Sequence, residues 1–499
     1  MLITCPKCFM RYQIDDRDLT LQRRMWCSNC KHTWVQPKLS ENFAKTIHPS
    51  DASPKHVSNP ALESGHSGSK VLPHLSDEEG NLIASQPSEY GQKPTGNINI
   101  PFVILVAGSM CVLLAMGLRA SFGLFLIPML SDLEWNREIF AIALALQNLF
   151  WGLLQPFASA AAEKWGTGRI IALGGALYAA GLYLMGNVSN PTTLHISAGL
   201  MIGAAQSGCA LAVVLGAVGR AMPEKKRSWG LGIVMAAGGV GQFTVVPMGQ
   251  ALLQSFNWSS ALVLFSALAC AIIFCAYPLR TSKASTSPPS NIKTTELLSM
   301  SNALREAFFH KGFWLLTIGF YVCGFHVAFI AVHLPAYLTD LGLPSSAGAW
   351  AISVIGIFNI FGSYVAGILG DKLRKKYLLS FLYFARAAVF LIFLLLPVTF
   401  GSVIFFSACL GLLWLSTVPL TSGLVAQIFG TRYMGTLFGI VFLSHQIGSF
   451  MGIWLGGYLF DYYGSYSPVW WAGVFLGFAA AIIHWPINDR AIVRSALSH

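Results

Sequence analysis

The chain has 499 residues, of which 54% are hydrophobic and only 11% are charged. Soluble domains carry about 25% charged residues, so this composition excludes an ordinary soluble enzyme and indicates a protein with many membrane-spanning helices. The net charge of +11 would suggest a nucleic-acid partner for a soluble protein. In a membrane protein, the distribution of lysine and arginine among the loops is more informative than their sum.

The first 37 residues are polar, basic and rich in cysteine. Cys5 and Cys8 form one C-x-x-C pair, and Cys27 and Cys30 form a second pair after 18 intervening residues. This spacing predicts a small β-type zinc ribbon, in which four thiolates hold a structural Zn²⁺ and leave no coordination position open. A disulfide is the alternative, but cytoplasmic thiols stay reduced. We expect no nucleic-acid partner, because nearby aspartates offset the basic residues. A cytoplasmic protein is the candidate partner, and a folded tag without a partner is the alternative.

Residues 38–98 are rich in Ser, Pro, Gly, Asn and His and contain no long apolar run, which predicts a disordered linker. Twelve apolar stretches follow, each close to the roughly 20 residues that a helix needs to cross a bilayer. They lie near 101–128, 138–161, 169–187, 192–219, 229–254, 259–279, 313–338, 347–369, 377–397, 401–427, 434–460 and 468–486. The fold class is therefore an all-α membrane protein preceded by the ribbon.

Lysine and arginine are concentrated in alternate connections between these stretches. One set of connections holds Lys164, Arg169, Arg220, Lys225, Lys226, Arg227, Arg280, Lys283, Lys293, Arg305, Lys311, Lys372, Arg374, Lys375, Lys376 and Arg432, whereas the other set holds only Arg137. Basic residues mark cytoplasmic loops, so both termini are predicted to be cytoplasmic. The predicted domains are a ribbon (1–37), a cytoplasmic linker (38–98), an N-terminal six-helix half (99–280), a cytoplasmic central loop (281–311), a C-terminal six-helix half (312–487) and a cytoplasmic tail (488–499).

The two halves are related by an offset of 207 or 208 positions. Pro128 maps to Pro335, Glu163-Lys164 to Asp371-Lys372, Gly232-Ile233-Val234 to Gly439-Ile440-Val441, and Gly241 to Gly448. Two similar halves with a site between them at mid-depth are the plan of many secondary transporters. The sequence has no nucleotide-binding loop, which argues against an ATP-driven pump. It also has no paired carboxylates, nucleophile motif or open metal site, so we do not expect an enzyme.

One cytoplasmic connection carries a family motif. The stretch Gly367-Ile368-Leu369-Gly370-Asp371-Lys372-Leu373-Arg374-Lys375-Lys376 resembles the signature loop of the major facilitator superfamily, with Arg374 where the family has glycine. Glu163-Lys164-Trp165-Gly166-Thr167-Gly168-Arg169 is a weaker copy in the first half. The resemblance implies a gating role for Glu163, Lys164, Arg169, Gly367, Asp371, Lys372 and Arg374. The alternative for the basic residues is that they only set the topology.

A narrower resemblance lies at the end of the first predicted helix. Gly117-Leu118-Arg119-Ala120-Ser121-Phe122-Gly123 resembles the monocarboxylate transporter group and its bacterial oxalate/formate relatives, in which a basic residue precedes a Ser-Phe-Gly run. This resemblance implies a small organic anion as substrate, with a monocarboxylate as the main candidate. The eighth helix has only Asn359 as a strongly polar group, and the eleventh has His445-Gln446. These departures argue against oxalate and leave the proton-coupling residue unassigned.

Polar side chains inside the predicted helices are the candidate substrate ligands, because burying them in hydrocarbon is costly. At an offset of 207, Arg119 falls on His326, so the two could face one substrate from opposite halves. Arginine offers a planar fork suited to a carboxylate, and histidine can exchange a proton. The candidate set is Arg119, His326, His333, Gln242, His445 and Gln446. The alternatives are snorkelling to the interface for Arg119 and hydrogen bonds between helices for the others.

The resulting hypothesis is a secondary active transporter of a small organic anion that works by alternating access, with proton coupling left open. Two alternatives remain: efflux of amphipathic compounds, and a transporter-like sensor that signals through the zinc ribbon. The expected location is the bacterial cytoplasmic (inner) membrane, with many passes through the lipid bilayer.

Overall fold

A computed structural model describes residues 2–4, 11–13, 24–26, 33–35, 99–223, 226–280, 300–430 and 433–492. The chain divides into two units, residues 1–91 and 92–499, and each is described separately.

The first unit contains two short antiparallel hairpins. In the first, β1 (Leu2–Thr4) pairs with β2 (Arg11–Gln13), and in the second β3 (Arg24–Trp26) pairs with β4 (Thr33–Val35). The sequence between the paired strands is six residues long in each hairpin, 5–10 and 27–32, and each of these stretches carries one C-x-x-C pair. The four cysteines themselves lie outside the described residues. Two hairpins with one such pair each in the intervening sequence are the arrangement expected of a zinc ribbon.

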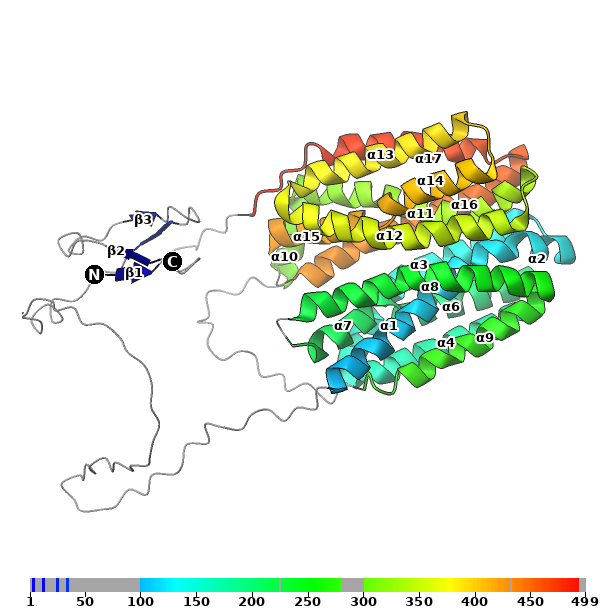
Figure 1. Cartoon of the computed structure of the whole chain (residues 1–499), viewed down its shortest axis with the longest axis horizontal. Coiled ribbons are helices and arrows are strands. Elements are labelled where there is room, and N and C mark those ends of the chain that lie inside the picture. The colour runs from blue at the N-terminus through cyan, green and yellow to red at the C-terminus, as the bar shows by residue number, and fades with distance from the viewer. Residues whose placement is uncertain are drawn as a thin grey trace, which may run out of the picture. The chain divides into compact units, whose positions relative to one another are not determined.

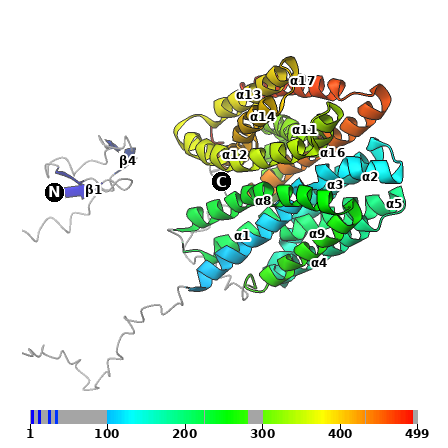
Figure 2. The same cartoon turned by 45° about the vertical axis from the view of Figure 1, so that its right-hand side comes forward.

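The described residues of the second unit form twelve helices or helix runs long and apolar enough to span a membrane, as the sequence predicts. Figures 1 and 2 show them as two adjacent groups, blue to green and yellow-green to red. The first half contains α1 (Asn99–Ala120), α2 (Leu126–Leu133), α3 (Arg137–Trp165), α4 (Thr167–Gly186), α5 (Pro191–Leu194), α6 (Ile202–Cys209), α7 (Leu211–Ala221), α8 (Arg227–Ser255) and α9 (Trp258–Cys275). The second half contains α10 (Met300–Phe309), α11 (Lys311–Asp340), α12 (Ser345–Lys372), α13 (Lys375–Leu395), α14 (Phe400–Leu413), α15 (Thr417–Phe429), α16 (Met434–Tyr463) and α17 (Ser467–His484).

The repeat explains how the helices pack inside each half. Gly241 on α8 lies against the backbone carbonyl of Leu113 on α1, and Gly448 on α16 lies against that of Tyr321 on α11. A Cβ atom added to either glycine would overlap a carbonyl oxygen. Small residues allow membrane helices to approach this closely, so these equivalent glycines set equivalent helix contacts in the two halves.

Two spans are interrupted at equivalent places. The fourth breaks at Ala210, between α6 and α7, and the tenth breaks just before Thr417, between α14 and α15. Polar backbone groups freed inside a membrane must find partners within the protein. In the tenth span, Arg386 on α13 donates hydrogen bonds to the carbonyls of Leu413 and Trp414, the latter at 2.8 Å. Arg386 is fully buried, and its charge lies at the negative end of the α14 dipole.

The halves meet mainly along two seams, α3 with α16 and α8 with α12, and the 3₁₀ turn Phe122–Phe125 of the first half also contacts α11. We call the end of this body that carries Arg137 the Arg137 end, and the opposite end, which carries Asp371, the Asp371 end. The seams position the polar residues described next.

Candidate substrate site and gate

Arg119 is the last basic residue of α1 and lies beside the seam between the halves. Its Nη2 donates to Asn148 Oδ1 on α3 at 2.7 Å, and its guanidinium carbon lies 5.2 Å from the centre of the Trp151 ring. Among the described residues, Asn148 is its only hydrogen-bond partner, it forms no ion pair, and its buried Nε has no partner. Because a guanidinium has five N–H donors in a planar fork, most of this group is left for a ligand.

Asn148 connects Arg119 to the opposite half. Gln446 on α16 donates its Nε2 to the Asn148 backbone oxygen at 3.1 Å, and His445 Nδ1 lies 3.0 Å from Gln446 Oε1. Since this oxygen can only accept, His445 Nδ1 carries the proton in this pair. Three of the predicted residues, Arg119, His445 and Gln446, therefore belong to one polar network that crosses the seam, and their role as substrate ligands stays a prediction.

Aromatic side chains border this network. The Trp151 and Phe442 rings meet edge to face with their centres 5.7 Å apart, across the α3–α16 seam. The Phe442 ring also stacks on His445, with 8° between the ring planes. An apolar border around one unpaired cation suits a small anion that carries a short hydrocarbon part.

The structure does not bring the other two histidines to Arg119. His326 is buried inside the second half, where its Nε2 lies 2.7 Å from the Gly473 oxygen on α17 and its ring lies beside Phe390. His333 lies nearer the Arg137 end and makes hydrogen bonds to the Ile453 oxygen on α16 and to the Tyr466 hydroxyl. Both make hydrogen bonds between structural elements, which is the alternative that the sequence left open.

Gln242 lies on the second seam. Its Nε2 donates to the Ile352 oxygen on α12 at 2.8 Å, so it joins the halves through a backbone group. Asn359, which is also on α12, accepts a hydrogen bond through its Oδ1 from the Leu415 backbone N–H at the break in the tenth span. Its role in the structure is therefore to satisfy the interrupted backbone.

A cross-half ion pair closes the Arg137 end. Arg137 at the start of α3 forms a two-pronged pair with Asp340 at the end of α11, with both N–O distances at 2.7 Å. Arg137 Nη1 also donates to the Tyr466 hydroxyl at 2.8 Å, and Asp461 accepts from the first two backbone N–H groups of α3. Together these contacts hold the first half against three elements of the second half.

The residues of the signature loop lie at the Asp371 end. Glu163, Lys164, Arg169, Asp371, Lys372 and Arg374 are exposed, and Gly367 is partly exposed. Within the described part of the chain, Asp371 forms no ion pair, so its gating role stays a prediction. Arg374 instead donates two hydrogen bonds to Asp489 in the segment after α17. The residue that departs from the family motif thus fixes the start of the C-terminal tail.

The Arg374–Asp489 pair gives a pH prediction. The guanidinium lowers the pKa of the Asp489 carboxyl below its ordinary value of 3.8, mainly through their hydrogen bond. The pair therefore stabilises the fold above that pH, and this contribution is lost as the pH falls through the lowered pKa. We expect Asp489→Asn to lower the thermal unfolding temperature by a few degrees at most at neutral pH, and by progressively less as the pH falls through the lowered pKa. Arg490→Gln is the control, and a variant indistinguishable from wild type at neutral pH would contradict this assignment.

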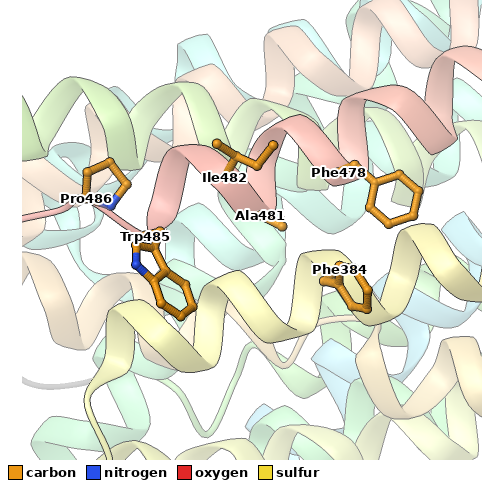
Figure 3. Close-up of a pocket in the computed structure, with 6 residues that line it drawn as sticks. All are labelled: Phe384, Phe478, Ala481, Ile482, Trp485 and Pro486. Atoms are coloured by element: carbon orange, nitrogen blue, oxygen red, sulfur yellow. The ribbon is translucent and has the colours of Figure 1, made fainter.

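A groove on the outer surface does not belong to the site. Figure 3 shows this groove, which has a volume of about 430 Å³ and is lined by apolar side chains of α13 and α17, including Phe384, Phe478 and Ile482. Ile482 is 72% exposed, as expected for a helix face in contact with lipid. The groove holds no charged side chain that could recognise an anion.

Sequence reasoning missed Asn148, Trp151 and the partners of Arg137. Asn148 and Trp151 lie on α3 about three residues apart, on the face that meets Arg119, so polar and aromatic residues at helical spacing were the available signal. Asp340 was not among the predicted site residues. Its pairing with Arg137 joins residues more than 200 positions apart, which a single sequence does not reveal.

The comparisons with known proteins agree with this architecture. Residues 108–453 match the Major Facilitator Superfamily. The chain belongs to the Major Facilitator Superfamily. It is therefore a multi-pass membrane protein of a transporter family. Residues 1–35 also match a zinc-ribbon domain.

Two similar chains are named transporters. An uncharacterized MFS-type transporter of Bacillus subtilis, YcxA, is 25% identical over 393 residues, which cover 74% of this chain and 91% of the relative. Monocarboxylate transporter 13 of Rattus norvegicus is 28% identical over 373 residues, which cover 73% of this chain and 83% of the relative.

Solved structures share the fold at low identity. A bacterial homolog of the human lysosomal transporter Spinster gives a TM-score of 0.60 at 15% identity, covering 79% of this chain and 95% of its own. The nucleoside transporter NupG gives 0.64 at 13% identity, covering 78% of this chain and 100% of its own. These likenesses show the fold alone.

Proposed function

We propose that this member of the superfamily is a secondary active transporter of small organic anions, with monocarboxylates as the substrate class. The two six-helix halves alternate in exposing a common site to the two sides of the membrane. Arg119 binds the carboxylate, and His445 and Gln446 provide polar contacts from the opposite half. The named monocarboxylate transporters among its relatives support this choice of substrate class.

The observation that carries the proposal is the state of the Arg119 side chain. It lies at the seam, it has no acidic partner among the described residues, and most of its donors are not used by the protein. A cation inside a membrane protein needs a partner or a water-filled cavity. An anionic substrate would be this partner while it is bound, and it is released in each transport cycle.

The proposed orientation follows the distribution of basic loops. Both termini lie in the cytoplasm, the protein resides in the bacterial inner membrane, and the Arg137 end faces outward. The ion pair between Arg137 and Asp340 then closes the outer side, so the structure corresponds to a state that binds or releases substrate at the cytoplasmic side.

Transport by the purified full-length protein in proteoliposomes tests the proposed substrate class. We expect uptake of at least one small monocarboxylate from a mixed panel of radiolabelled carboxylates, with uncharged amphipathic compounds as the comparison. An inward proton gradient that accelerates uptake would establish proton symport. Uptake that depends instead on anion inside the vesicle would establish exchange. Transport of the amphipathic compounds without any carboxylate would contradict the proposal and favour efflux.

The N-terminal ribbon motivates a second candidate function, a sensor that reports site occupancy to a cytoplasmic protein. We propose that Cys5, Cys8, Cys27 and Cys30 hold one structural zinc ion, since one cysteine pair lies in the sequence between the two strands of each hairpin. When bound, the metal would link the two loops without performing chemistry.

Metal analysis and truncation test the role of the ribbon. We expect one zinc ion per purified chain and none after Cys27→Ser and Cys30→Ser are combined, with full transport retained. Deleting residues 1–98 should also leave proteoliposome transport intact. If the truncated protein does not transport, the helical body is not an autonomous transporter, and the sensor function gains support.

A further inference from the structure

His333 lies behind the ion pair that closes the Arg137 end. Its Nε2 lies 2.8 Å from the Ile453 oxygen on α16, and its Nδ1 lies 3.1 Å from the Tyr466 hydroxyl. A carbonyl oxygen can only accept, so Nε2 carries the ring proton and Nδ1 accepts from the phenol. The tautomer of the neutral ring is therefore fixed by its surroundings.

Tyr466 connects this histidine to the gate. Its oxygen accepts from Arg137 Nη1 at 2.8 Å while its hydrogen points to His333. Burial raises the pKa of Tyr466, so the phenol keeps its proton near neutral pH. Asp340 accepts hydrogen bonds from both terminal nitrogens of Arg137. A continuous chain of hydrogen bonds therefore runs from His333 through Tyr466 and Arg137 to Asp340.

We propose that His333 is a proton-binding residue of the transport cycle and that protonation of its Nδ1 releases the ion pair between Arg137 and Asp340. The neutral ring fits the closed gate, because it offers the single acceptor that the Tyr466 hydroxyl needs. The proposal rests on the alternating-access transport proposed above, but it does not depend on which anion is carried.

Protonation would remove that acceptor. Nδ1–H would become a donor to the Tyr466 oxygen, which already accepts from Arg137, and the phenolic hydrogen would be left without a partner in a site only 1% exposed. A buried unpaired donor is costly, and a second positive charge would now lie one phenol away from Arg137. Both effects weaken the contact that holds the halves together.

Charged side chains of both halves lie near the His333–Tyr466 pair. Arg137 on α3 opposes a positive imidazole, whereas Asp340 at the end of α11 and Asp461 at the end of α16 are the carboxylates near Tyr466. In the closed gate, Asp340 is neutralised by Arg137, and Asp461 accepts from the backbone of α3. Separation of the halves removes Arg137 and leaves both carboxylates on the side of His333. The protonated ring is therefore better accommodated in the open gate.

A distance measurement across the gate tests the proposal without any substrate. Nitroxides are attached through a ketone-bearing amino acid at Ser189 in the first half and Leu341 in the second, both exposed near the Arg137 end. This chemistry avoids the native cysteines. Pulsed electron-resonance distances are then recorded on the full chain in nanodiscs at about pH 7.5 and about pH 5, a range that spans histidine protonation.

We expect the ratio of closed to open molecules in the wild type to fall roughly 5- to 150-fold at the lower pH, the usual range for coupling between two sites. His333→Gln keeps a donor and an acceptor but cannot become charged, so it should remain closed at both pH values. His484→Gln replaces another buried histidine of the second half and should respond like the wild type.

Tyr466→Phe provides an independent check, because it removes the connecting hydroxyl and leaves His333 in place. It should open the gate partly at both pH values and show little further response to acid. A wild-type distribution that does not change with pH would overturn the proposal, as would an unchanged pH response in His333→Gln. Neither result depends on whether carboxylates are transported, so failure here is distinct from failure of the proposed function.

Discussion

Replacing Arg119 by alanine is expected to reduce carboxylate transport more than any other substitution at the site. Truncating one partner of a desolvated charge pair typically costs about 2–5 kcal/mol, so the apparent affinity should fall at least about 30-fold. Arg119→Lys keeps the charge but loses the planar fork, so we expect it to recover only part of the affinity. The measurement is the concentration dependence of initial uptake in proteoliposomes.

Arg280→Ala is the matched control for this experiment. Arg280 is an exposed arginine at the Asp371 end that lies over the Tyr277 ring, and it has no contact with the network around Arg119. Its loss removes the same formal charge and should leave the uptake affinity unchanged. If Arg119→Ala is equally harmless while the protein stays folded, Arg119 does not bind the substrate.

The second large effect is expected at the gate. Arg137→Gln removes the two-pronged pair with Asp340, in which the arginine side chain is only 11% exposed. Hydrogen bonds to charged groups contribute about 1.5–3 kcal/mol, so the ratio of closed to open molecules should fall roughly 10- to 150-fold. Transport should slow as well, because one of the two alternating states is no longer stabilised.

A cysteine at the contact between α11 and the 3₁₀ turn Phe122–Phe125 measures this shift. Val332 on α11 is buried, and its backbone lies close to Gly123 of the first half. A thiol introduced by Val332→Cys should therefore become reactive toward a membrane-impermeant reagent only when the Arg137 end opens. We expect faster labelling from that side in Arg137→Gln and unchanged labelling in Arg280→Gln. Equal labelling rates in all three proteins would show that the ion pair does not control this end.

The sequence predicted the helices well because a membrane imposes a simple rule on length and composition. The repeat at an offset of 207 or 208 relates backbone positions in the two halves. The repeat does not predict the direction of side chains. Arg119 precedes the 3₁₀ turn Phe122–Phe125, whereas His326 lies within the uninterrupted helix α11. Equivalent positions in the two halves therefore present their side chains to different neighbours.

The gate was harder to predict for another reason. Arg137 was recognised only as the single basic residue of its set of loops, and that rule concerns topology rather than partners. Its importance comes from Asp340 and Tyr466, which the fold brings to it from the other half. Asn148 was missed because an asparagine in a long helix has no distinctive spacing until its neighbours are known.

The interruptions of the fourth and tenth spans illustrate how a duplicated chain diverges. They fall 207 positions apart, and α4 and α13 are related by an offset of 208, so the residue equivalent to Arg386 in the first half is Tyr178. The Tyr178 hydroxyl donates a hydrogen bond to the Ala115 oxygen instead of to the interrupted backbone. The halves have thus inherited the place where the helix stops, while each satisfies the exposed backbone with its own chemistry. Exchanging Arg386 and Tyr178 between the halves would preserve the ancestral alignment and still leave a buried cation without its carbonyl partners. The internal symmetry of this protein therefore concerns the backbone, and side chains at equivalent positions of the two halves are not interchangeable.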